Sequence, residues 1–85
     1  MSIKIAIAED NSFLLKAILD KLAIYPEIEV KFHGYNGLEF LEKLEKDPNV
    51  HLILMDIEMP KMNGIDTVEK VTQKYPQIKI IMLTV

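Results

Sequence analysis

HLILMDIEMP, residues 51–60, is an apolar run that ends at an acidic residue and continues into a Met-Pro pair. A run of four apolar residues, Leu52 to Met55, is too short for a helix and is typical of a strand buried on both faces, as in parallel sheets. The predicted strand over 51–55 therefore delivers Asp56 to its carboxyl end. The loop after it contains Met59-Pro60 and Gly64.

Similar apolar runs lie on both sides of this stretch. Residues 3–8 predict a strand that ends at the acidic pair Glu9-Asp10, and residues 79–85 predict a fourth strand. Between them, Ile28, Val30 and Phe32 alternate with charged residues. This alternation predicts a strand over 28–32 with one exposed side, as at a sheet edge.

The segments between the predicted strands have apolar residues at the spacing of a helix, so we expect a helix in each. Asn11 or Ser12 is expected to cap the first helix and Asn36 the second, while the third runs from Asn63 onward. The apolar positions at helical spacing are Leu14, Leu15, Ile18, Leu19 and Leu22, then Leu38, Phe40, Leu41 and Leu44, then Ile65, Val68 and Val71. The order β-α-β-α-β-α-β predicts one domain over 1–85, with helices on both faces of a parallel sheet.

Composition narrows the function. The net charge is −3 and every basic residue is a lysine, which argues against direct nucleic acid binding. Cysteine is absent, so thiolate metal sites and cysteine nucleophiles are excluded. The apolar runs are too short to span a bilayer and no signal peptide is evident, so we expect a cytoplasmic protein without membrane contact.

Acidic residues follow the first and third predicted strands. Because the carboxyl ends of parallel strands lie along one edge of the sheet, Glu9, Asp10 and Asp56 should converge if those strands are neighbours. Thr84 lies near the end of the fourth. Crowded carboxylates repel unless a cation lies among them, and Mg²⁺ prefers such oxygen ligands and also binds phosphate. The alternative interpretation is that each is a solvated loop charge, and the isolated histidines His33 and His51 are interpreted as structural.

These motifs together resemble the receiver domain of two-component response regulators. The resemblance rests on Glu9-Asp10, on residues 54–60 (LMDIEMP) with 62–64 (MNG), and on 82–84 (MLT), and it covers the whole chain. It implies a flavodoxin-like (CheY-like) three-layer α/β/α fold with strand order 2-1-3-4. It also implies a signalling phosphoacceptor, not a turnover enzyme, that takes its phosphoryl group from a sensor histidine kinase.

The resemblance also implies residue roles. Asp56 matches the phosphoacceptor, and Asp10 matches a direct Mg²⁺ ligand. Glu9 matches the acidic residue that reaches the ion through water, and the backbone carbonyl of Glu58 matches a third ligand. Thr84 matches the hydroxyl residue that hydrogen-bonds the phosphoryl group and moves on activation.

A complete receiver continues past the fourth strand, whereas this chain stops at Val85. We therefore expect a (βα)3β portion that lacks the last strand, the last two helices and the family's lysine, and that is a fragment or an engineered piece. Part of Leu15 and Leu19 should then be uncovered, and the fourth strand should be an open edge. Both features predict self-association.

Other functions remain open. Without the lysine, the chain could be a phosphorylation-incompetent module that only binds proteins. A phosphohydrolase fits less well, because its Asp-x-Asp motif would be Asp56-Ile57-Glu58 here. A flavin site is disfavoured by the acidic loop at 9–12. The run at 80–84 resembles receivers that precede a LuxR-type DNA-binding domain, so transcription control would belong to a longer parent protein.

Overall fold

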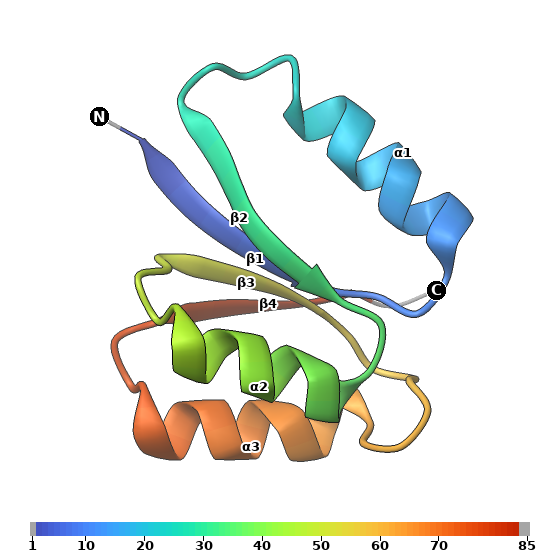
Figure 1. Cartoon of the computed structure of the whole chain (residues 1–85), viewed down its shortest axis with the longest axis vertical. Coiled ribbons are helices and arrows are strands. Elements are labelled where there is room, and N and C mark those ends of the chain that lie inside the picture. The colour runs from blue at the N-terminus through green and yellow to red at the C-terminus, as the bar shows by residue number, and fades with distance from the viewer. Residues whose placement is uncertain (1, 84–85) are drawn as a thin grey trace.

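The computed structural model describes residues 2–83, in which four strands and three helices alternate along the chain. The elements are β1 (Ile3–Ala8), α1 (Ser12–Leu22), β2 (Ile28–Gly34), α2 (Gly37–Lys46), β3 (Leu52–Asp56), α3 (Gly64–Lys74) and β4 (Lys79–Leu83) (Figure 1). The predicted order of elements is confirmed. The last two residues of the predicted fourth strand, Thr84 and Val85, lie outside the described residues.

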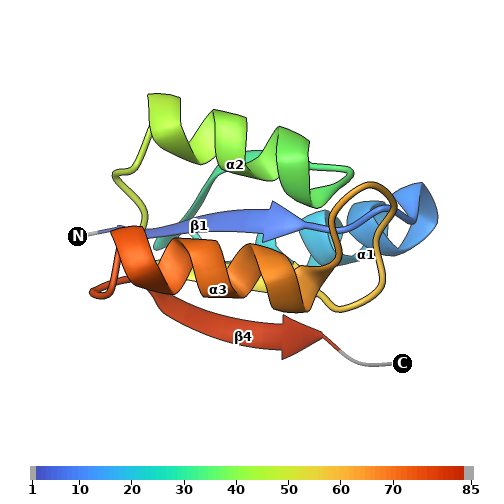
Figure 2. The same ribbon diagram turned by 90° about the horizontal axis from the view of Figure 1, so that it is seen from below.

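All strand pairs in the sheet are parallel, and the strand order is β2-β1-β3-β4, which confirms the order that the resemblance implied. Helix α1 covers one face, while α2 and α3 lie side by side on the other (Figure 1). Figure 2 shows β1 and β4 pointing the same way, with the β3–α3 loop at the ends of the strands. Within residues 2–83 no helix has the length and apolar character needed to cross a membrane.

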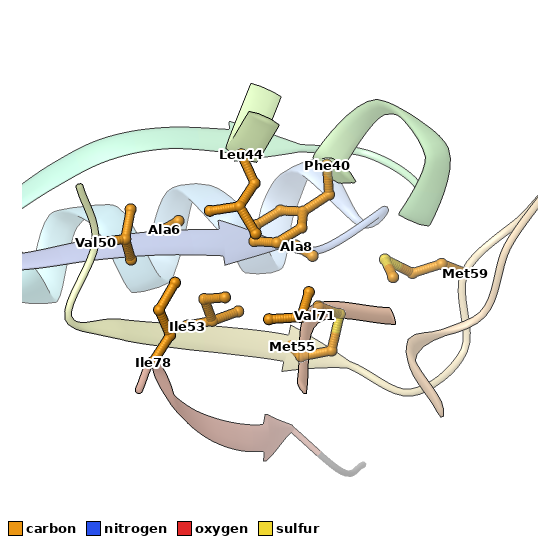
Figure 3. Packing of buried hydrophobic residues seen from close by; sticks show 10 residues of the cluster. All are labelled: Ala6, Ala8, Phe40, Leu44, Val50, Ile53, Met55, Met59, Val71 and Ile78. Carbon is orange, nitrogen blue, oxygen red and sulfur yellow. The ribbon is translucent and has the colours of Figure 1, made fainter. Parts of the chain in front are cut away.

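Alternation along β1 divides the core between the two faces. Ile5 and Ile7 pack with Leu15 of α1, whereas Ala6 and Ala8 face α2 and α3. The second cluster is the larger one and is shown in Figure 3; its members are Ala6, Ala8, Phe40, Leu44, Val50, Ile53, Met55, Met59, Val71 and Ile78. The small alanine side chains leave room for the large side chains of α2 on this face.

An asparagine caps each helix. The side chain of Asn11 accepts hydrogen bonds from the Phe13 and Leu14 N–H groups, so Asn11 is the first cap and Ser12 already belongs to the helix. Asn36 accepts from the Glu39 N–H at 2.8 Å, and Asn63 accepts from the Asp66 N–H at 2.9 Å. Each bond satisfies a backbone donor that has no partner within its helix.

Three details of the predicted apolar faces are wrong. Ile28 and Val30 pack on the α1 side, but Phe32 packs on the α2 side, because the β1–β2 register shifts between Ile5 and Ala6 and leaves one extra residue in β2. That residue, Lys31, forms an ion pair with Asp47 at 3.3 Å.

On α1, Leu15 is 3% exposed rather than partly uncovered, because it packs against Ile5 and Ile7. Leu19 is half-buried, so it is partly uncovered as predicted, and the large apolar side chains of this helix that are exposed are Phe13 and Leu14. On α3, Ile65 is exposed and Thr67 is buried in its place.

Candidate functional site

The register of the two central strands brings the predicted acidic residues together. Ala8 pairs with Met55, so the next residues, Glu9 and Asp56, leave the sheet side by side. Asp10 follows Glu9 on the loop into α1. Carboxylate oxygens of Glu9, Asp10 and Asp56 all lie within 4.8 Å of one another. The convergence expected from the strand order is therefore present.

Burial differs sharply among the three carboxylates. Glu9 is 2% exposed and Asp56 is 8% exposed, while Asp10 is exposed. The Asn11 N–H donates to one carboxylate oxygen of Glu9 at 3.1 Å. The other, Oε1, is buried and has no hydrogen-bond donor among the described residues. A buried carboxylate oxygen without a donor costs free energy, because it has lost its contact with water and gained no hydrogen bond.

Burial raises the pKa values of Glu9 and Asp56, and a neighbouring carboxyl group adds to each rise. Burial away from water raises the pKa of Glu9 to about 7; the Asn11 N–H acts against this rise, and the nearby Asp56 carboxyl adds to it. Burial also raises the pKa of Asp56, and the Asp10 carboxyl adds to that rise, while the Glu58 N–H opposes it. Without a cation, the site therefore disfavours the fully ionised state.

The acidic cluster lies in an open cleft of about 760 Å³. Its lining combines acidic and polar residues with apolar residues from α1, the loop and α3; these are Glu9, Asp10, Asn11, Leu14, Asp56, Ile57, Glu58, Met59, Pro60, Asn63 and Ile65. Asp56 is thus reachable from outside although little of its surface is exposed. A ligand the size of a phosphate group has ample room beside it.

The loop over residues 57–63, called the acceptor loop from here on, is bound tightly to the end of β3. The Gly64 N–H donates to the Ile57 carbonyl at 2.7 Å, and a Cβ on Gly64 would overlap the Asp56 carbonyl. The Met62 N–H donates to the Pro60 carbonyl at 2.7 Å, which closes a γ-turn around Lys61, whose φ is 66°. Glycine at 64 is therefore required by close backbone packing and not by a left-handed conformation, since the residue of this loop with positive φ is Lys61.

The remaining predicted residues are distributed as follows. The Glu58 N–H lies 3.4 Å from Asp56 Oδ1, and the Glu58 backbone belongs to the cleft wall. Thr84 lies outside the described residues, so its predicted role is untested. His51 Nδ1 accepts from the Lys4 N–H at 3.0 Å, at the beginning of β3, and is a structural residue as predicted.

Sequence reasoning missed Gly37 and Thr67. Thr67 is fully buried at the base of the acceptor loop, and its hydroxyl donates to the Asn63 carbonyl at 2.7 Å. Gly37 begins α2 and touches the same loop. The sequence does contain a signal for Thr67, because it is a polar residue three positions after the pair Asn63-Gly64. No local pattern indicates that Gly37 contacts the acceptor loop.

The residues present fit a divalent cation. Three carboxylates supply hard oxygen ligands at one point, and the unpaired Glu9 Oε1 shows that the described protein groups do not balance the charge. Glu9, Asp10 and Asp56 are the residues whose carboxylate oxygens would hold the ion. The acidic cluster is thus chemically suited to a hard divalent cation such as Mg²⁺.

Comparisons with known proteins agree with this geometry. The family model described as "Response regulator receiver domain" matches residues 5–85. The chain is 37% identical to the transcriptional regulatory protein DegU of Brevibacillus brevis, over 98% of this chain and 35% of that protein. It therefore spans about a third of the length of this relative.

Two solved structures are similar over nearly the whole chain. One is the response regulator domain of Thermotoga maritima CheB, with a TM-score of 0.88 and 30% identity, covering 96% of this chain and 60% of that one. The other is a CheX–CheY–BeF3–Mg complex from Borrelia burgdorferi, with a TM-score of 0.84 and 25% identity, covering 94% of this chain and 60% of the matched one. With the strand order and the acidic cleft, these matches lead to one conclusion: the chain belongs to the response regulator receiver domain family.

Proposed function

We propose that this chain accepts a phosphoryl group on Asp56 from a sensor histidine kinase, with Mg²⁺ held by Asp10, Asp56 and the Glu58 carbonyl, and with Glu9 acting through water. The observation that carries the proposal is the meeting of three carboxylates within 4.8 Å in an open cleft. The Mg²⁺ and BeF3 named with the similar CheX–CheY complex support it.

The chain's own groups suit this reaction. An oxygen of Asp56 attacks the phosphorus atom, and the bond between phosphorus and the donor's imidazole nitrogen breaks. Asp10 and Glu9 keep the cleft negative, so it favours a cation that can approach together with a phosphate. When bound, Mg²⁺ neutralises charge on the transferred group and favours the ionised form of Asp56.

Modification of the purified chain tests this proposal. Incubation with Mg²⁺ and acetyl phosphate, followed by intact-mass measurement, should show the addition of one phosphoryl group. Asp56→Asn should abolish the addition, because the amide is not a nucleophile at this site. Asp20→Asn removes an exposed aspartate from α1 and should leave the addition unchanged. Addition that persists in Asp56→Asn, or fails in the unmodified chain, would contradict the proposal.

We extend the proposal to partners and location. A second copy of the chain is a candidate partner, because β4 has a neighbour on only one side among the described strands and exposes Ile81. Thr84 would hydrogen-bond the phosphoryl group. We place the protein in the cytoplasm and assign any DNA binding to other parts of a longer parent, in line with the transcriptional role named for DegU.

A further inference from the structure

The first residue of α2 touches the acceptor loop through its backbone. The Gly37 N–H donates to the Met62 carbonyl at 3.2 Å. A Cβ placed on Gly37 would lie 2.6 Å from the Met62 carbonyl oxygen and 2.9 Å from Met62 Cβ, and it would overlap the Thr67 hydroxyl. Only a residue without a side chain therefore allows α2 and the loop to meet in this way.

The other attachments of the acceptor loop are at its two ends and its middle. The N–H of Gly64, the first residue of α3, donates to the carbonyl of Ile57, the first residue of the loop, and the Thr67 hydroxyl joins Asn63 to α3. Met59, in the middle, is 9% exposed and packs in the larger core cluster (Figure 3). The Gly37 hydrogen bond is an attachment from a different element, and it acts on Met62, the last residue of the γ-turn around Lys61.

The hydrogen bond from Gly37 to Met62 matters for the site because residues of the same loop line the cleft. Glu58, Met59 and Pro60 line the same cleft as Asp10, and the Glu58 N–H lies 3.4 Å from Asp56 Oδ1. A displacement of Met62 is transmitted along the short γ-turn to these residues. Their distance from the carboxylate cluster would then change although no residue in contact with the ligand had been altered.

We propose that Gly37 is a positioning residue for phosphoryl transfer at Asp56: by admitting Met62 against the first turn of α2, it sets the position of the Glu58 carbonyl relative to the three carboxylates. The inference rests on the proposed function. It adds helix α2 to the elements that position the residues of the site. Any side chain at 37 pushes the loop away from α2. Groups that orient ligands from behind in this way change metal affinity or activity by about 10-fold to 100-fold when they are altered.

Gly37→Ala tests the proposal. Its control is a variant that also lowers the stability of the fold but is altered away from the site. The control, Val50→Ala, removes buried volume before the beginning of β3, at the opposite end of the sheet from the cleft (Figure 3). Three quantities are measured on each chain: the thermal midpoint, the Mg²⁺ dissociation constant by calorimetry, and the rate of acetyl phosphate modification at saturating Mg²⁺. Sucrose in the buffer keeps both variants folded.

The expected result is that Gly37→Ala weakens Mg²⁺ binding about 10-fold and slows the modification, whereas Val50→Ala lowers only the thermal midpoint. In the double variant Gly37→Ala/Thr67→Ala, the atom nearest to the added methyl group is gone, so Mg²⁺ affinity should partly return relative to Gly37→Ala. Thr67→Ala alone provides the reference for the loss of its bond to Asn63.

The outcomes separate this inference from the proposed function. If the unmodified chain binds Mg²⁺ and is phosphorylated, and Gly37→Ala matches either the unmodified chain or Val50→Ala in both properties, the positioning role is overturned. If the unmodified chain binds Mg²⁺ without being phosphorylated, the Mg²⁺ comparison still decides the role of Gly37. If it does neither, the proposed function fails, and the positioning role fails with it.

Discussion

Glu9 has the most perturbed environment in the site, although the resemblance gives it only an indirect role. It is nearly fully buried, one carboxylate oxygen has no donor among the described residues, and burial raises its pKa to about 7. Asp10, which matches the direct ligand, is the exposed member of the cluster. The sequence placed both acids at one strand end, but it could not rank their burial, because burial depends on how the loop into α1 folds back.

The raised pKa of Glu9 predicts how the metal-free protein responds to pH. Between pH 4.5 and about 7 the unfolded chain releases this proton while the native protein keeps it. The free energy of unfolding should therefore fall as pH rises through this window, by at most about 3 kcal/mol from this residue. Below the window both states hold the proton, and above it both have released it.

Urea unfolding across this pH range measures the effect. Glu9→Gln cannot ionise, so its stability should fall less than that of the unmodified chain over the same interval, and the difference between the two curves isolates Glu9. Saturating Mg²⁺ should reduce the difference, because the cation stabilises the ionised carboxylate. Parallel curves without Mg²⁺ would show that Glu9 is not protonated in the native state at neutral pH.

At the scale of the elements, local patterns predicted the beginnings of the helices better than the faces of the strands. Asn36 caps its helix as expected, since a capping bond spans only three residues. The shift at Phe32 depends instead on pairing with β1, which local alternation cannot reveal. On α3, the buried hydroxyl of Thr67 bonds to a backbone carbonyl, so a polar residue takes the position expected for an apolar one.

The edge strand β4 belongs to this scale as well. Ile81 is 49% exposed, and an edge strand has backbone groups free to pair with another chain. We expect the average mass in sedimentation velocity to rise with concentration, and Ile81→Lys to suppress the rise. Ile24→Lys, which replaces a side chain 72% exposed and outside the strands, should leave it unchanged. A monomeric unmodified chain at high concentration would rule out self-association.

At the scale of the whole molecule, the strand order determines where the chemistry lies. Because β1 and β3 are neighbours at the centre of the sheet, their carboxyl ends form the cleft, with α1 on one side and the acceptor loop on the other. The sequence allowed the order of elements and the acidic edge to be predicted, since both follow from apolar runs and strand ends. The contact between Gly37 and Met62 joins residues far apart in the chain, so only the folded structure reveals it.

A cation bound at this edge should stabilise the entire fold. A ligand that binds only the native state at 100 times its dissociation constant adds about 2.7 kcal/mol. The thermal midpoint should therefore rise with Mg²⁺ in the unmodified chain. It should rise much less in Asp10→Asn, whose exposed side chain can be changed with little effect on the metal-free fold. Equal shifts in both chains would place the Mg²⁺ elsewhere.

The two-sided packing of β1 has a consequence for how this molecule can vary. Ile5 and Ile7 pack on the side of α1, whereas Ala6 and Ala8 pack on the side of α2 and α3. Glu9 comes directly after this strand. Replacing one apolar side chain by another leaves this alternation intact. Inserting or deleting a single residue within β1 would instead move every later side chain of the strand to the opposite face, and Glu9 would then point away from Asp56. The length of the first strand, counted in residues, is thus as strict a requirement of the chemistry as the identity of the acids themselves.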